Sequence, residues 1–419
     1  RPNLENMGNK WVGKGLGSFT GINLFYANKY IIMNIEPYYY NSQNEDVNET
    51  NRYPAYSFEA PNIFNVLNDN RYFKNEPYRD IGFRESSIFL HHKKFGIGIS
   101  NSNMWWGPGL HSSLTMTNNT TGFPHLMIGT INEKIIGKIG INLRYYFSQL
   151  KKIKGSPYFS ALTFSSRIFS KPTITFGLTR NYLSGGLPTD REFSMLDAAL
   201  LPFESLFIDQ KIKNYPTGWD AHDNWDQTMS GYITIEDFDS GLIFFIELGT
   251  DDHRQNLMDL RSQPDHTMAS IIGIRKYGIF NDDSFFAGFE YANIKYTYTH
   301  KFRGIGSWWW RDFYEYSTYD GRRWAAHSGS DSDDFYFYFG YDNNSWSFTP
   351  GFNYERHGII TGNPPEQKFE FRLDLKFSYK KYRFKIYYER ELLNNFEFIP
   401  GKLYRANVLW FRIEKDFLI

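Results

Sequence analysis

The sequence predicts an all-β fold: a transmembrane antiparallel β-barrel of about 18 strands, with short helices in long outer loops. Three observations lead to this prediction: the aromatic content, the alternation of apolar with polar residues, and the alternation of short with long connections. Phe, Tyr and Trp make up 19% of the 419 residues, yet the mean hydropathy is −0.53. A barrel combines these properties because lipid-facing residues alternate with polar lumen-facing ones. A soluble propeller or sandwich is the alternative.

The segment 368–377 shows the alternation most clearly. One face carries Phe369, Phe371, Leu373, Leu375 and Phe377, and the other carries Lys368, Glu370, Arg372, Asp374 and Lys376. Successive side chains of a strand point to opposite faces of the sheet. The polar face has charges of both signs, which suits a barrel lumen crossed by ion pairs.

Short polar connections alternate with long segments along the chain. Short turns are expected at 27–28, 92–94, 132–134, 169–172, 237–240, 281–283, 342–344 and 380–381, and long loops at 41–83, 102–124, 182–227, 250–266, 300–332, 357–367 and 392–403. Bacterial barrels have short periplasmic turns and long outer loops. The last strand, near 404–415, should therefore end in the periplasm. About 17 strands follow residue 17, and an even number requires another, expected within 9–16.

Two of the long segments contain helix signals. One covers 57–69 and begins near a proline. The other covers 189–212, with Thr189 and Asp190 as its expected cap and Pro202 as a kink or break. These helices could plug the pore or only pack within the loops. No shift in composition marks a boundary, so one domain is expected over 1–419.

Composition excludes several classes of function. Lys+Arg and Asp+Glu both number 46, and no basic cluster stands out, so no nucleic-acid partner is expected. The absence of cysteine excludes disulfides, thiolate zinc sites and cysteine nucleophiles. The acidic run Asp331–Asp334 could bind calcium through its oxygens, but the Asp/Asn spacing and the glycine of a calcium loop are missing. We therefore expect no metal and no cofactor.

The run 82–130 carries the most specific motif. An Arg-Glu hairpin is followed by Trp-Trp-Gly-Pro-Gly, Ser-Leu-x-Met-x-Asn-Asn and Gly-Phe-Pro. This run resembles the Wzi-like capsule-assembly family, and 327–341 matches more weakly. The resemblance implies a lectin-like barrel in the bacterial outer membrane that holds exopolysaccharide and assists capsule assembly. Members of that family have a periplasmic helical bundle near the N-terminus. Here residues 1–40 read as strands, so that bundle is not expected.

The candidate carbohydrate-binding residues lie in two outer loops expected to meet over the barrel mouth. They are Trp105, Trp106, Asn118, Asn119, Trp308, Trp309, Trp310, Tyr314, Arg322 and Arg323. Aromatic faces stack on sugar rings, amides offer paired hydrogen-bonding positions, and arginine binds carboxylates of acidic sugars. The tryptophans could instead belong to an aromatic girdle, and the asparagines could satisfy buried backbone groups.

A non-catalytic barrel that binds surface polysaccharide is thus the leading interpretation. Its expected partners are the polysaccharide, outer-membrane lipid and, in some assemblies, other outer-membrane proteins. Two alternatives remain open. One is a channel or an accessory subunit of a larger outer-membrane complex. The other is a hydrolase at the barrel rim that uses Asp251, Asp252 and His253.

Overall fold

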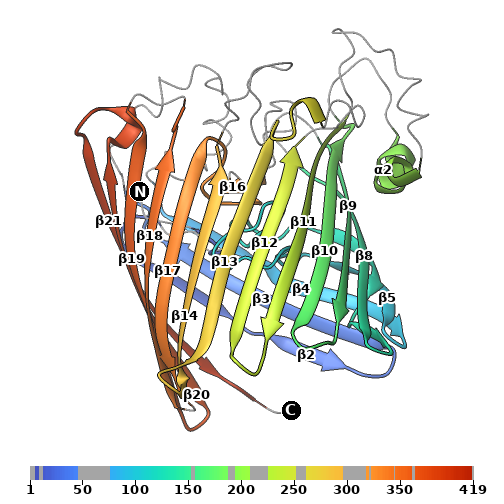
Figure 1. Cartoon of the computed structure of the whole chain (residues 1–419). Helices are drawn as coiled ribbons and strands as arrows, with labels where there is room; N and C mark the ends of the chain where they lie inside the picture. Colours follow the sequence, from blue (N-terminus) through green and yellow to red (C-terminus); the bar gives the residue numbers. More distant parts are fainter. Residues whose placement is uncertain are drawn as a thin grey trace.

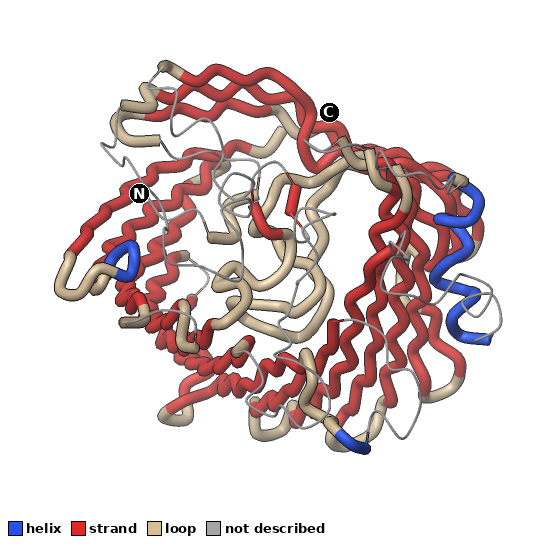
Figure 2. Tube along the Cα trace, turned by 90° about the horizontal axis from the view of Figure 1, so that it is seen from above, coloured by secondary structure: helices blue, strands red, loops and turns tan. Residues whose placement is uncertain are grey.

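The computed structural model describes residues 5–8, 13–45, 76–151, 156–186, 194–207, 225–251, 261–295, 318–319, 322–343, 345–360 and 364–417. Nearly all its strands belong to one antiparallel sheet that curves around a central space (Figures 1 and 2). Among these residues, no helix has the length and apolar character needed to cross a membrane.

The main sheet contains 19 strand segments. They are β1 (Gly17–Gly21), β2 (Leu24–Ala27), β3 (Ile31–Ser42), β4 (Tyr78–His92), β5 (Phe95–Ser100), β6 (His125–Thr130), β7 (Lys134–Ile136), β8 (Ile139–Gln149), β9 (Tyr158–Ile168), β10 (Thr173–Ser184), β11 (Trp225–Asp237), β12 (Leu242–Asp251), β13 (Met268–Ile279), β14 (Asp282–Ile294), β17 (Ser332–Asp342), β18 (Trp346–His357), β19 (Glu366–Tyr379), β20 (Tyr382–Asn394) and β21 (Leu403–Lys415). A separate pair consists of β15 (Thr318–Tyr319) and β16 (Arg322–Arg323).

The strands pair in chain order, as in an up-and-down barrel. Because β1 and β2 both pair with β3, and β6 and β7 both pair with β8, the 19 described segments amount to 17 strands. This agrees with the count expected after residue 17. Part of the stretch expected to hold one more strand, 9–12, lies outside the described residues. Lys14 forms an isolated bridge with Glu45.

The two faces of the wall differ as the alternation predicts. In β19, Lys368 and Glu370 are 4% and 3% exposed, whereas Phe369 between them is 42% exposed. On the outer face aromatic rings pair across strands: Phe377 and Phe384 stack with centroids 4.6 Å apart. Such a pair contributes about 0.5–1.5 kcal/mol beyond its burial. Charged residues therefore line the interior, and aromatic residues line the outer surface.

The connections confirm the expected topology, with two corrections. The turn expected at 132–134 is instead Gly137–Lys138, since Ile136 pairs with Ile139 and Gly137 has a φ of 60°. Glycine takes this left-handed conformation without strain, and tight hairpins require it. The turn expected at 281–283 lies one residue earlier, at Phe280–Asn281. The C-terminus lies at the short-turn end, as predicted (Figure 1).

The described outer loops contain the 3-10 helix η4 (Phe396–Phe398) and the α-helix α2 (Met195–Phe207). Its cap is Ser194, whose Oγ accepts a hydrogen bond from Asp197 N at 3.1 Å while Asp197 Oδ2 accepts one from Ser194 N. Thr189, Asp190 and the expected helix at 57–69 lie outside the described residues. Pro202 does not split α2. The helix lies against the outer side of the wall, so it does not plug the pore (Figure 2).

Candidate functional site

Residues 101–124 and 324–331 together fill the interior of the barrel, and we call them the plug (Figure 2). Leu114, Met116 and Phe123 of the plug are at most 1% exposed. They form one apolar core with Trp324 and with Phe159 of the wall. The hydrophobic core of this molecule therefore lies inside the barrel, between plug and wall.

Two buried wall carboxylates hold the plug. Glu290 of β14 accepts hydrogen bonds from the backbone N–H groups of Ser112, at 2.8 Å, and of His111 and Leu110. Glu247 of β12 accepts from Leu114 N at 3.4 Å, and from Ser230 Oγ. A buried donor left without an acceptor costs about 1–3 kcal/mol. These acids supply the acceptors that the irregular loop backbone needs inside the barrel.

The Gly-Pro-Gly break of the motif makes this close approach possible. A Cβ on Gly109 would lie 1.8 Å from Ser112 O, and one on Gly107, whose φ is +124°, would lie 2.7 Å from Glu247 Oε2. Side chains larger than glycine would push the loop away from its wall acceptors. The motif therefore builds the plug.

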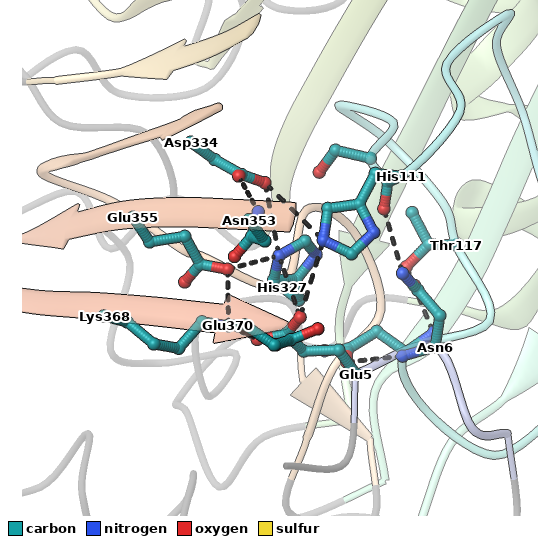
Figure 3. A network of polar contacts seen from close by, with 12 residues as sticks. Glu5, Asn6, His111, Thr117, His327, Asp334, Asn353, Glu355, Lys368 and Glu370 are labelled. Atoms are coloured by element: carbon teal, nitrogen blue, oxygen red, sulfur yellow. Dashed lines mark hydrogen bonds and ion pairs between the residues drawn. The ribbon is translucent and has the colours of Figure 1, made fainter. Parts of the chain in front are cut away.

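Glu5, His111, His327, Asp334 and Glu355 meet in the interior, and we call them the interior cluster (Figure 3). His327 Nε2 lies 2.8 Å from Glu355 Oε1, 3.3 Å from Asp334 Oδ2 and 3.4 Å from Glu5 Oε2. His111 Nε2 lies 3.5 Å from Glu5 Oε2 and 4.0 Å from Asp334 Oδ2. These five residues come from the N-terminal segment, both parts of the plug, β17 and β18.

Two cations from β19 adjoin the interior cluster. Lys368 Nζ lies 2.7 Å from Glu355 Oε1, and it also pairs with Glu5 Oε1. Arg372 pairs with Glu370 at 2.5 Å and lies 3.6 Å from Glu5 Oε2. Buried ions require such partners, because leaving water is costly for each of them alone.

The two histidines differ in protonation. Burial, together with the charges of Arg372 and His327, lowers the pKa of His111 to about 3. Burial also acts to lower the pKa of His327, but the carboxylates of Glu5 and Glu355 outweigh it and raise that pKa well above its ordinary value. Near neutral pH, His111 is therefore neutral and His327 carries a proton.

A second polar site lies between the wall and the plug, and we call it the polar cavity. Its volume is about 240 Å³. It is lined by Tyr38, Asp80, Phe83, Arg84, Glu85, Asn101, Asn103, Thr121, Gly122 and Tyr319. Strands β3 and β4 supply its wall side, and the two ends of the 101–124 segment supply the other.

Within the polar cavity the acids and amides have defined orientations. Tyr38 Oη donates to Asp80 Oδ2 at 2.5 Å. Asn103 Nδ2 donates to Glu85 Oε1 at 2.9 Å, and Glu85 has a left-handed φ of 46°. Arg84 pairs with Glu36 at 2.5 Å, so its charge is already matched. The cavity thus combines carboxylates, amides and tyrosine rings.

Sequence reasoning did not name this cavity. Arg84, Glu85, Asn101, Asn103 and Gly122 all belong to the run 82–130 that carries the family resemblance. Their presence in that run was a signal. Only the folding of the plug against β3 and β4, however, brings them beside Tyr38 and Tyr319.

The predicted residues of the first loop lie within the plug. Trp106 is 6% exposed, with its ring centroid 5.1 Å from that of Tyr146. Asn119 Nδ2 donates to Arg323 O at 2.9 Å, and its Oδ1 accepts from the backbone of Asn6. Trp105 is partly buried, and the Asn118 carbonyl accepts from Gly8 N at 2.8 Å. These contacts favour the structural alternative for Trp106 and Asn119.

The second predicted loop is described only in part. Trp308, Trp309, Trp310, Tyr314 and the side chain of Arg322 lie outside the described residues. The Arg323 guanidinium donates to His327 O at 3.3 Å. The two loops do meet, because Thr117 Oγ1 donates to Ala325 O at 2.7 Å. This contact lies inside the barrel, so the prediction of a meeting over the mouth was wrong for these residues.

The remaining candidates are also placed. Asp251 is 3% exposed at the end of β12, where its N–H donates to Thr267 O, and Asp252 and His253 lie outside the described residues. Asp331 accepts a hydrogen bond from Ile360 N at 3.1 Å. Asp333 pairs with Lys295 at 2.8 Å. Protein groups thus bind two acids of the acidic run Asp331–Asp334.

The fold is that of the β-barrels of the Gram-negative outer membrane. Among solved structures it is similar to Wzi of Escherichia coli, described as an outer-membrane protein involved in group 1 capsule assembly and a carbohydrate-binding β-barrel. The TM-score is 0.59 at 12% identity, over 95% of this chain and 76% of Wzi. This likeness confirms the predicted fold class, and at that identity it establishes the fold alone.

Two other solved structures are more distant. OprD of Pseudomonas aeruginosa has a TM-score of 0.42 at 8% identity, over 96% of this chain and 90% of its own. OccAB2 of Acinetobacter baumannii has a TM-score of 0.41 at 10% identity, over 95% and 92%. These scores are too low to support an argument. No protein-family model matches the chain, and no curated protein does.

Proposed function

We propose that this protein is an outer-membrane barrel that binds surface polysaccharide and assists capsule assembly without catalysis. The observation that carries the proposal is the polar cavity of about 240 Å³ between the wall and the plug. Pockets for drug-sized ligands measure roughly 300–1,000 Å³, so this cavity suits a single sugar unit.

The side chains that line the polar cavity suit the hydroxyl groups of a sugar. An ionised carboxylate accepts hydrogen bonds and donates none, and sugar hydroxyls can donate them. Asp80 and Glu85 supply such acceptors, and the amides of Asn101 and Asn103 supply both donors and acceptors. Tyr38 and Tyr319 add ring surface for the apolar face of a sugar. Because Arg84 already pairs with Glu36, we infer that a neutral sugar is preferred to an acidic one.

The plug supports binding rather than passage. Its apolar residues pack against the wall, and Glu290 and Glu247 hold its backbone. An open channel would require this packing to be displaced. The description of Wzi as carbohydrate-binding agrees with the proposal. A longer polysaccharide would have a second contact surface, formed by Trp308, Trp309, Trp310, Tyr314 and Arg322. Outer-membrane lipid and other outer-membrane proteins are further proposed partners.

A glycan-array screen of the detergent-solubilised protein tests the proposal. We expect binding to neutral surface glycans, reduced at least tenfold by Asp80→Asn and by Thr121→Trp, which fills the cavity. Asp239→Asn, in an exposed turn at the opposite end of the barrel, is the matched control. Replacement of the 308–310 tryptophans by Ala tests the second surface separately. Binding unaffected by both cavity variants would refute the cavity as the site.

A further inference from the structure

We propose that the interior cluster is a binding site for a divalent transition-metal ion of the zinc class. The ligands are His111 Nε2, His327 Nε2, Glu5 Oε2 and Asp334 Oδ2. The sequence predicts no metal, and these four residues come from three separate parts of the chain, near residues 5, 111 and 327–334. The fold alone brings them together (Figure 3).

Four separations among these atoms are close to those of ligands around one ion. Zinc bonds to imidazole nitrogen and carboxylate oxygen measure about 2.0–2.2 Å, which in a tetrahedron places neighbouring ligand atoms about 3.4 Å apart. Here Glu5 Oε2 lies 3.5 Å from His111 Nε2 and 3.4 Å from His327 Nε2. Asp334 Oδ2 lies 3.3 Å from His327 Nε2 and 4.0 Å from His111 Nε2.

Two of these atoms are buried polar groups that no hydrogen bond satisfies. Among the described residues, His111 Nε2 and Asp334 Oδ2 make no hydrogen bond, although both side chains are 2% exposed. Both point into the space where the ligand atoms converge (Figure 3). Buried polar atoms normally have partners, so two unsatisfied atoms aimed at one point indicate a missing one. A metal ion would coordinate both.

The four ligand atoms face one another, and His327 Nε2 also lies 2.8 Å from Glu355 Oε1 while Glu5 Oε2 lies 3.6 Å from Arg372. Glu355 is engaged through both oxygens, with Lys368 at 2.7 Å and His357 at 2.7 Å. Lys368 contacts Glu5 through Oε1, which leaves Glu5 Oε2 directed at the histidines. Glu355 belongs to the same group of converging ligand atoms, but Lys368 and His357 hold its two oxygens, so we assign it as a neighbour of the ligands.

The charge balance also favours a divalent cation. The acids joined by ion pairs around the cluster are Glu5, Asp334, Glu355 and Glu370, and the permanent cations are Lys368 and Arg372. Four negative charges against two positive ones leave two negative charges when both histidines are neutral ligands. Two imidazoles with two carboxylates and no thiolate suit zinc better than calcium or magnesium.

Zinc binding to the purified full chain tests this inference. The detergent-solubilised protein is stripped with a chelator, zinc chloride alone is added, and the protein-bound metal is measured by elemental mass spectrometry. We expect one zinc ion per chain, a higher unfolding temperature with zinc than without, and an X-ray absorption spectrum with nitrogen and oxygen ligands. No uptake at micromolar zinc would overturn the proposal.

Variants decide whether any bound zinc lies in this cluster. His111→Gln and Asp334→Asn should each weaken zinc binding about 100-fold or more, given that even outer-shell changes cost 10–100-fold. His125→Gln is the control, because His125 is also buried but bonds to Phe123 O outside the cluster. Wild-type affinity in a folded His111→Gln or Asp334→Asn protein contradicts the proposal. An equal loss in the control places the ion elsewhere and also overturns it.

Discussion

The imidazole rings of His111 and His327 lie with their centroids 4.4 Å apart, one in each part of the plug. Glu290 of the wall anchors the first part beside His111, and Glu355 of the wall contacts His327. The barrel therefore holds both parts of its plug through polar groups of nearby wall strands, β14 and β18. Predictions about the plug follow from these contacts.

Glu290→Ala should loosen the plug. The substitution removes the acceptor for the N–H groups of Leu110, His111 and Ser112, and each buried group left unsatisfied costs about 1–3 kcal/mol. We expect a lower unfolding temperature, and we expect new conductance in planar bilayers where the wild-type protein should show none. The control is Asp374→Ala, a wall acid that pairs with Lys385. Equal conductance in both variants would contradict the anchoring role.

The orientation of the barrel can be determined with single-cysteine variants, because the chain has no cysteine of its own. Asn343 and Asp239 lie in short turns, and Lys402 precedes β21 at the long-loop end. On intact cells we expect a membrane-impermeant maleimide to label Lys402→Cys but neither Asn343→Cys nor Asp239→Cys. All three should react after lysis. Labelling of the turn positions on intact cells would reverse the topology.

The lipid-facing side of β19 should reject charge. Leu373→Arg is expected to cost about 2–4 kcal/mol near the membrane midplane. Thr349 pairs across the strands with Asp374 on the lumen face, so Thr349→Arg should destabilise the protein much less. Urea unfolding in lipid vesicles measures both. Equal tolerance of the two substitutions would indicate a soluble protein.

Trp106→Ala tests the structural role of the Trp-Trp motif. Loss of a buried tryptophan that packs on Tyr146 and Phe159 should destabilise the protein by about 3–5 kcal/mol. Trp346→Ala removes a ring that is 46% exposed near a short turn, so its cost should be smaller. The same unfolding assay compares them. If Trp106→Ala costs no more than the control, the ring is available for a ligand.

The sequence predicts the wall well because strand alternation is local. Lys368 and Phe369 face opposite sides of the sheet because they are neighbours in one strand. Turn positions depend on finer signals: Asn132–Lys134 has turn composition, but Gly137 has the conformation that the hairpin needs. The polar stretch near Asn132 therefore interrupts the strand formed by β6 and β7 and does not reverse the chain.

The interior could not be predicted in the same way. The contacts of His111 with His327 and of Asn103 with Glu85 depend on how deep the loops descend and on which wall acid meets them. Neither composition nor periodicity specifies how far the loops descend into the barrel. The Trp105–Asn119 stretch was recognised as unusual for sound chemical reasons. Sugar contact and interior packing draw on the same aromatic and amide groups, and the fold favours packing for Trp106.

Cell-surface polysaccharide retention tests the central claim most directly. Cells that express the wild-type protein, Asp80→Asn or Thr121→Trp are compared, with correct barrel assembly checked by heat-modifiable migration on gels. The account predicts that both cavity variants assemble normally and retain much less surface polysaccharide than wild type. Assembled variants that retain polysaccharide at the wild-type level would contradict it.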